Sequence, residues 1–180
     1  MKKTRCFLAL LPGPQLHRQL FDCARQLRAR TPSREVRWSR AEQLHLTLAF
    51  FGDLSDEQIE KLCDALPARF RGIGPVSSFI DQVSQFPNPA NPKVIAALLE
   101  RSPSLQAVQA QCYLPGEDPD KHYRPHITLG RYRRSPHTPV FNPLPVAWQL
   151  EADEVLLIAS ELTQEGPVYT ELAGFKLKGA

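Results

Sequence analysis

Two short segments of the chain alternate apolar and other residues with the period of a β-strand. Leucine or phenylalanine occupies every second position of residues 44–50, and isoleucine and leucine occupy alternate positions of residues 126–130. Side chains along a strand point alternately to opposite faces, so the apolar residues of each segment share one face. We therefore predict two half-buried strands that each place a histidine and a threonine on the other face: His45 with Thr47, and His126 with Thr128.

The elements before these two strands follow the same order in each half of the chain. In the first half, an apolar strand at residues 6–11 stops at Pro12, and a helix with a regular apolar stripe begins at Pro14. In the second half, an apolar strand at residues 94–99 precedes a helix that begins near residues 102–103. The order strand, helix, His-x-Thr strand occurs twice, which indicates an old internal repeat.

Further elements are predicted from capping and turn residues. Ser55 and Gln58 fit a capping box that opens a helix through about residue 66. Strands are expected near residues 76–83, 154–160 and 168–177, and residues 136–145 form a proline-rich loop. The segment 86–92 is rich in proline and asparagine, which oppose both helix and sheet, so we expect a boundary between two lobes there.

Composition and charge narrow the class of protein. The 180 residues are 42% hydrophobic with a net charge of +3, as expected for a globular chain with only a mild preference for anionic partners. The four cysteines are scattered without a CxxC pair, which favours reduced thiols. No segment is apolar for long enough to be a signal peptide or a membrane span, so we expect a cytoplasmic protein without membrane contact. We also expect a monomer.

The paired histidines are the strongest indication of chemistry. A single His-x-Thr on a strand is usually the solvent face of a half-buried sheet. Two copies in equivalent places of a repeat favour a shared site instead. An imidazole has an ordinary pKa near 6.5, so one histidine can act as a base and the other as an acid in displacement at phosphorus, while threonine hydroxyls donate to the phosphate oxygens.

Two rival uses of these residues receive little support. Zinc or iron catalysis usually needs a third protein ligand, and no acidic or histidine-rich cluster accompanies either motif, so we expect neither a metal nor another cofactor. The chain has no GxSxG elbow, no glycine-rich phosphate loop and no cysteine next to a motif histidine.

The full motifs resemble those of a known superfamily. The stretches His45-Leu-Thr-Leu-Ala-Phe-Phe-Gly52 and Arg124-Pro-His-Ile-Thr-Leu-Gly-Arg131 are similar to the two signatures of the 2H phosphoesterases, and most similar to those of the bacterial RNA 2′,3′-cyclic phosphodiesterases, also called 2′-5′ RNA ligases. The resemblance covers nearly the whole chain. It implies one bilobal α+β domain over residues 1–180, with a pseudo-twofold axis, two antiparallel sheets flanking a central groove, and helices on the outside.

The resemblance also implies an activity and a division of roles. It implies metal-independent opening of RNA 2′,3′-cyclic phosphate ends to 2′-phosphomonoesters, with reversible ligation of 2′-5′ linkages as a further activity. His45 would be the proton donor and His126 the proton acceptor, with Thr47 and Thr128 holding the phosphate. The residues alone are too symmetric to assign these two roles.

Two further residues are candidates for substrate binding. Arg131 matches a family position that neutralises the phosphate, but strict alternation points it away from His126, so it reaches the site only if the strand bulges or ends at Gly130. A surface arginine is the alternative. Phe51 is in phase with His45 and could stack a nucleobase, or it could belong to the core.

Three functions remain open at this point. The first is a cyclic phosphodiesterase acting on RNA ends. The second is the same chemistry on another small cyclic phosphate or a 2′-5′ oligonucleotide. The third is a nucleotide-binding module without turnover, against which the two intact motifs argue. Loops such as 118–122 and 136–145 are expected to select the substrate.

Overall fold

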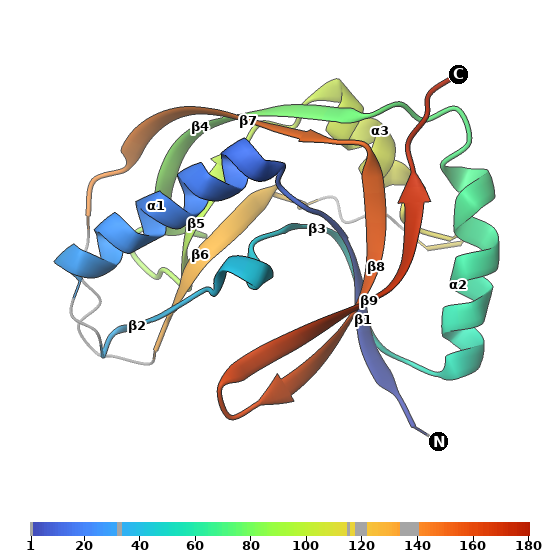
Figure 1. Ribbon diagram of the computed structural model, residues 1–180, viewed down its shortest axis with the longest axis horizontal. Coiled ribbons are helices and arrows are strands. Elements are labelled where there is room, and N and C mark those ends of the chain that lie inside the picture. The colour runs from blue at the N-terminus through green and yellow to red at the C-terminus, as the bar shows by residue number, and fades with distance from the viewer. Residues whose placement is uncertain (1, 32–33, 115, 118–121, 134–140) are drawn as a thin grey trace.

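Nine strands and three α-helices make up the regular structure of the described residues (Figure 1). The computed structural model describes residues 2–31, 34–114, 116–117, 122–133 and 141–180. The strands are β1 (Thr4–Leu10), β2 (Val36–Trp38), β3 (Leu46–Leu54), β4 (Val76–Phe86), β5 (Val94–Leu99), β6 (His126–Tyr132), β7 (Leu144–Ala152), β8 (Glu154–Thr163) and β9 (Gly166–Lys176). The helices are α1 (Pro14–Arg30), α2 (Asp56–Arg69), α3 (Pro103–Gln111) and the short 3₁₀ turn η1 (Ala41–Gln43).

All of these strands pair in antiparallel fashion in one sheet, in the order β7-β4-β5-β6-β3-β1-β8-β9, with β2 also paired to β6. The two strands that carry the motifs, β3 and β6, meet at the centre through a single residue pair, Leu46 with Ile127. The two expected sheets are therefore two halves of one sheet joined at one point. The predicted α+β class is confirmed.

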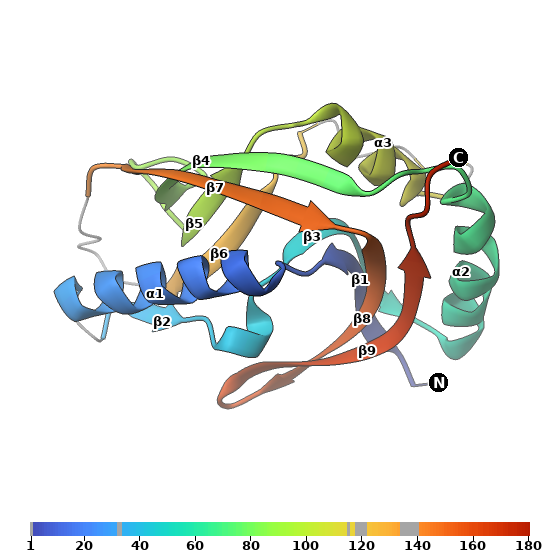
Figure 2. The same ribbon diagram turned by 45° about the horizontal axis from the view of Figure 1, so that its top comes forward.

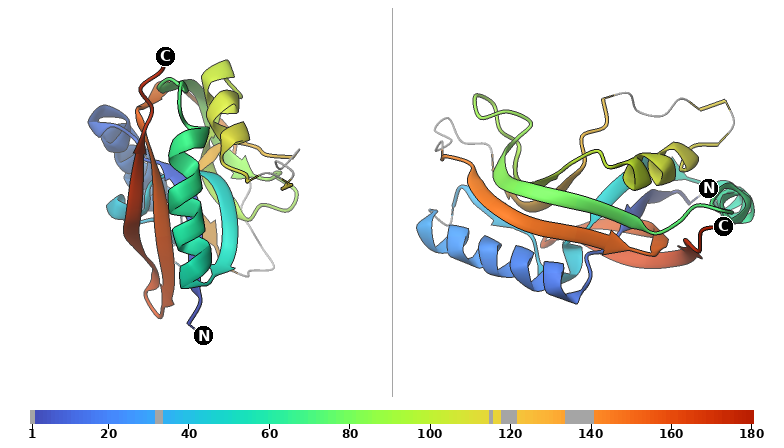
Figure 3. Two further views of the ribbon diagram at one scale, coloured as in Figure 1. Left: turned by 90° about the vertical axis from the view of Figure 1, so that its right-hand side faces the viewer. Right: turned by 90° about the horizontal axis from the view of Figure 1, so that it is seen from above.

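The two halves of the sheet have equivalent strand pairings, as the internal repeat predicted. In each half, the first apolar strand of the repeat pairs with its His-x-Thr strand: β1 with β3, and β5 with β6. Two more strands extend each half, β8 and β9 beyond β1, and β4 and β7 beyond β5. The long β8–β9 hairpin is visible below the centre of Figure 1, and β4 and β7 run side by side in Figure 3.

The chain does not complete one half before it begins the other. The segment 86–92, where the sequence suggested a lobe boundary, instead connects β4 to β5, which pair with each other inside one half. Strand β1 pairs with β8, the second-last strand of the chain, so the half that contains His45 is built from both ends of the chain. Prolines and asparagines in this segment mark the turn of a hairpin, which has the same composition as a linker.

The helices cover the apolar face of the sheet and its ends. Helix α1 packs on β6 and β7, α2 on β3 and β9, and α3 on β4 (Figure 2). The apolar stripe of α1 is formed by Leu16, Leu20, Ala24 and Leu27. The capping box of α2 is confirmed, because Ser55 Oγ accepts from the Gln58 amide at 3.3 Å and Gln58 Oε1 accepts from the Ser55 amide at 2.8 Å.

Candidate active site

Each motif histidine is held by the same kind of contact, between Nδ1 and the backbone carbonyl of the residue two positions before it. His45 Nδ1 lies 2.7 Å from the carbonyl oxygen of Gln43, and His126 Nδ1 lies 2.8 Å from the carbonyl oxygen of Arg124. A carbonyl oxygen can only accept, so Nδ1 carries the proton and donates it in each case. The neutral imidazole then has an unprotonated Nε2, which is the atom available for proton transfer. His45 Nε2 is also 2.9 Å from Thr47 Oγ1.

A β-bulge after each threonine changes which side chains reach the site. In β3, Thr47 and Ala49 pair with consecutive residues of β1, so Leu48 is an extra residue. In β6, Thr128 and Gly130 pair with consecutive residues of β5, so Leu129 is the extra one. A bulge places two successive residues on one side and shifts the phase of everything beyond it. The residue three positions after each threonine therefore returns to the threonine face.

These equivalent positions are occupied by Phe50 in the first motif and Arg131 in the second. Both line the same groove as the histidines and threonines. Arg131 therefore reaches the site because β6 bulges before it, which was the condition stated from the sequence. Phe51 does not line the groove and packs against the core, whereas Phe50 is 55% exposed. Sequence reasoning missed Phe50 because it assumed unbroken alternation in β3.

The groove that contains both histidines has a volume of about 540 Å³, and we call it the histidine groove. Its walls come from β1, β2, β3, β6 and the β8–β9 hairpin. It is lined by Arg5, Phe7, Arg37, Trp38, Ser39, Gln43, His45, Thr47, Phe50, His126, Thr128, Arg131, Ser160, Leu162, Pro167 and Tyr169. Five of the six predicted site residues, namely both histidines, both threonines and Arg131, thus share one cavity, and Phe51 does not line it.

Aromatic rings support each imidazole. Around His45, the ring of Phe7 lies at 4.9 Å and that of Tyr169 at 5.3 Å, the latter edge to face. His126 stacks on Phe86 at 4.2 Å with an interplanar angle of 25°, and the guanidinium of Arg124 lies 4.6 Å from the ring centre of Phe86. Rings packed in this way restrict the orientation of both imidazoles.

Burial shifts both imidazoles toward their neutral form. The pKa of His45 is lowered from its ordinary value chiefly by burial and further by the charge of His126, while its bond to the Gln43 carbonyl opposes the shift. The pKa of His126 is lowered by burial and by the guanidinium groups of Arg124 and Arg131, against its bond to the Arg124 carbonyl. The protein surroundings alone therefore favour two neutral imidazoles near pH 7.

In the part of the chain that the structure describes, no group of three or more histidine, cysteine, aspartate or glutamate side chains is placed to hold a metal ion. No helix among these residues is long and apolar enough to cross a membrane. Most of the loops expected to select the substrate, 118–122 and 136–145, lie outside the described residues.

Known proteins are similar to this chain in sequence and in fold. The family model described as LigT like Phosphoesterase matches residues 11–96, which include the first motif but end before the second. A protein of Thermus thermophilus named RNA 2′,3′-cyclic phosphodiesterase is 30% identical over 97% of this chain and 91% of its own. One of the same name from Methanothermobacter thermautotrophicus is 28% identical over 97% of this chain and 100% of its own.

Solved structures agree with the fold over almost the full length. The crystal structure of TT0787 of Thermus thermophilus superposes with a TM-score of 0.81 at 28% identity, covering 97% of this chain and 98% of the other. E. coli LigT complexed with phosphate has the same fold, with a TM-score of 0.71 at 23% identity over 99% of both chains. With two His-x-Thr strands facing one groove, the chain belongs to the LigT-like, or 2H, phosphoesterase family.

Proposed function

We propose that this protein hydrolyses RNA 2′,3′-cyclic phosphate ends to 2′-phosphomonoesters by metal-independent acid–base catalysis, as a cytoplasmic monomer of one domain. The observation that carries the proposal is the placement of two equivalent histidines, each with its Nδ1 bonded to a backbone carbonyl, in one groove with two threonine hydroxyls. Relatives named RNA 2′,3′-cyclic phosphodiesterase support this choice of substrate.

The proposed reaction needs one proton to be accepted and one to be donated. Neutral His126 takes a proton at Nε2 from the attacking water, whose oxygen forms the new bond to phosphorus. The bond between phosphorus and the ribose O3′ breaks, and protonated His45 gives its Nε2 proton to that oxygen. The product carries a 2′-phosphate. Each positioned proton transfer typically contributes about 10²–10⁴-fold in rate.

The bound substrate would favour the protonated form of His45, which burial disfavours. A bound phosphate anion favours the imidazolium, and so it opposes the effects that lower the pKa of His45. When His45 is neutral, its Nε2 accepts from the hydroxyl of Thr47, which lies 2.9 Å away. Protonation of Nε2 reverses this contact and frees the Thr47 hydroxyl to donate to a phosphate oxygen. Thr128 would serve the same purpose from β6.

Phe50 and Arg131, the residues beyond the two bulges, would bind different parts of the nucleotide and so fix its orientation in this symmetric site. The guanidinium of Arg131 can pair with the phosphate oxygens from the side of β6. On the side of β3, the exposed ring of Phe50 offers a surface for a nucleobase, with the Arg5 guanidinium 5.0 Å from its centre. A nucleotide bound with its base on Phe50 and its phosphate near Arg131 spans the two halves of the sheet.

The test is conversion of a short RNA that ends in a 2′,3′-cyclic phosphate, in excess EDTA, with the product mapped as a 2′- or 3′-phosphate. We expect a 2′-phosphate from the wild type, and losses of about 10²–10⁴-fold for His45→Ala and for His126→Ala. His17 on α1, which does not line the groove, provides the control His17→Gln, because the Gln amide can still donate to the Ala41 carbonyl that His17 Nε2 contacts. Binding without conversion would favour a nucleotide-binding module, and turnover restored only by a metal would contradict the mechanism.

A further inference from the structure

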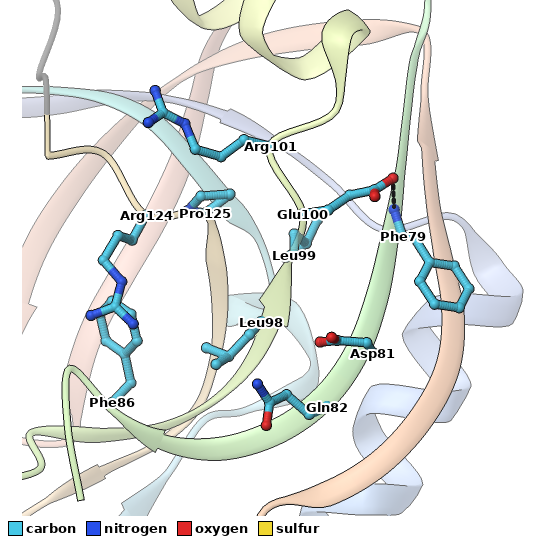
Figure 4. Close-up of a pocket in the computed structure, with 10 residues that line it drawn as sticks. All are labelled: Phe79, Asp81, Gln82, Phe86, Leu98, Leu99, Glu100, Arg101, Arg124 and Pro125. Carbon is cyan, nitrogen blue, oxygen red and sulfur yellow. Dashed lines mark hydrogen bonds between the residues drawn. The ribbon is translucent and has the colours of Figure 1, made fainter.

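Figure 4 shows a second cavity, of about 370 Å³, that lies outside the histidine groove. It is close to His126, which stacks on the lining residue Phe86. Its walls are the exposed sides of β4 and β5, the start of the segment after β5, and the residues that lead into β6. We call it the Asp81 cavity. It is lined by Phe79, Asp81, Gln82, Phe86, Leu98, Leu99, Glu100, Arg101, Arg124 and Pro125.

The Asp81 cavity and the histidine groove share a wall. Phe86 forms this wall, because one face of its ring stacks on His126 at 4.2 Å and the Arg124 guanidinium lies 4.6 Å from its centre. Leu98, which lies in the cavity, is the direct partner of His126 in the pairing of β5 with β6. A substrate bound at His126 therefore has the Asp81 cavity beside it, one aromatic ring away.

Side chains of both signs of charge line the Asp81 cavity. Arg101 and Arg124 stand on one side, and Asp81 points into the opening from β4 on the other (Figure 4). Glu100 is engaged, because its Oε1 accepts from the Phe79 amide at 3.2 Å. Within the described part of the chain, by contrast, neither the carboxylate of Asp81 nor the guanidinium of Arg101 has a hydrogen-bond or ion-pair partner.

The backbone of β4 is also irregular at this point. Asp81 is skipped in the pairing of β4 with both of its neighbours, since Ile80 and Gln82 pair with consecutive residues of β5. Bulges of this kind redirect a side chain and are frequent beside functional sites. The bulge therefore presents an exposed, unpaired carboxylate in the middle of β4, next to the edge strand β7.

We propose that the Asp81 cavity binds the nucleotide that precedes the cyclic-phosphate end, so that the enzyme prefers an oligonucleotide to a cyclic mononucleotide. This rests on the proposed function. Arg101 and Arg124 would contact the phosphate that joins the last two nucleotides, because guanidinium groups suit phosphate oxygens. The base would pack on Leu98, and its amino group would donate to the Asp81 carboxylate, which can only accept.

The experiment compares kcat/KM for a cyclic mononucleotide with kcat/KM for a dinucleotide that ends in the same 2′,3′-cyclic nucleotide. For the wild type we expect a gain of about tenfold or more on the dinucleotide, as for one or two charge-assisted hydrogen bonds. Asp81→Asn and Arg101→Gln should each remove most of this gain and leave the mononucleotide rate unchanged. Asp64→Asn and Arg71→Gln change the same charges on residues outside both cavities and should keep the gain.

The outcomes separate this inference from the function on which it rests. Equal kcat/KM for the two substrates, with both hydrolysed, would overturn the subsite and leave the phosphodiesterase intact. Hydrolysis of neither substrate would overturn the proposed function itself. A gain that survives both Asp81→Asn and Arg101→Gln would also overturn the assignment, because the preceding nucleotide would then bind elsewhere. A thermal unfolding curve for each variant shows that the comparison uses folded protein.

Discussion

Gly130 should tolerate no side chain, although its counterpart in the first motif is an alanine. Gly130 follows the extra residue of the β6 bulge and pairs with Trp38 of β2. A Cβ at this position would lie 2.6 Å from Val36 Cγ1 and 3.0 Å from Trp38 Cε3. Ordinary carbon contacts are about 3.5–4.0 Å, so β2 would have to move by roughly 1 Å. Overpacking of this kind typically costs about 1–3 kcal/mol.

The same displacement should reach the proposed site. Ser39, at the end of β2, donates from its amide to the Leu129 carbonyl at 2.8 Å and from its hydroxyl to the Thr128 carbonyl at 3.1 Å. A shift of β2 therefore moves the backbone that carries Thr128 and Arg131. Because a misplacement of about 1 Å can cost up to about 10²-fold in rate, we expect Gly130→Ala to lower kcat/KM by about tenfold or more.

Thermal unfolding and cyclic-phosphate hydrolysis measure the two effects. Each kcal/mol should lower the Tm by about 2–4 °C in a chain of this size. Gly74→Ala is the control, because its nearest neighbour would be the Gly179 Cα at an ordinary 3.9 Å. Adding Val36→Ala to Gly130→Ala removes the closest contact and should recover part of the loss in a double-mutant cycle. An unchanged Tm and an unchanged rate in Gly130→Ala would refute the reasoning.

Three other perturbations test separate parts of the structure. Burial lowers the pKa of both His45 and His126. A plot of kcat/KM against pH should therefore be bell-shaped, with its maximum below about pH 6.5. A flat profile from about pH 5 to 9 would contradict the acid–base pair. The stability that these neutral imidazoles contribute should be present above about pH 6.5 and be lost as the pH falls through their lowered pKa values, as urea unfolding would measure. Phe50→Leu should raise KM for nucleotides about tenfold with little change in kcat, since stacking is worth about 1–3 kcal/mol per base, whereas an equal rise in Phe51→Leu would assign the effect to the core. Ser55→Ala should destabilise the protein by about 1 kcal/mol through loss of the α2 cap, and an unchanged Tm would show that the capping box contributes nothing.

The hydrophobic pattern predicted most elements of the fold, but not how they are distributed between the two halves. Strand β5 and the start of α1 lie where the apolar run 94–99 and Pro14 placed them. Strand β2 is only three residues long, which is too short to show a periodic pattern. In β7, by contrast, Leu144, Val146, Trp148 and Leu150 alternate and pack on the core, so its strand pattern was present and was missed. Alternation also carries no information about pairing partners. The alternation pattern therefore could not predict that β1 pairs with β8.

The candidate site was predictable as far as strict alternation holds. Both histidines and both threonines precede the bulges, and the sequence brought them to one site. Beyond the bulges the phase changes, which explains why Phe51 was chosen and Phe50 was missed. A signal for the change was present in both motifs, where threonine is followed by leucine and then by a small residue, Ala49 or Gly130. The small residue allows the two successive positions to be buried together.

The pairing of β1 with β8 also has a consequence for synthesis of the protein on the ribosome. Strand β1 begins at Thr4 and needs β8, which begins at Glu154, as its second neighbour. The half with β4, β5 and β6 can assemble while the C-terminal hairpin is still missing, but the half with His45 cannot. Contacts this distant in sequence form slowly, and an unpaired apolar strand favours aggregation during that interval. A nascent chain should therefore gain its first histidine site only after translation is nearly complete.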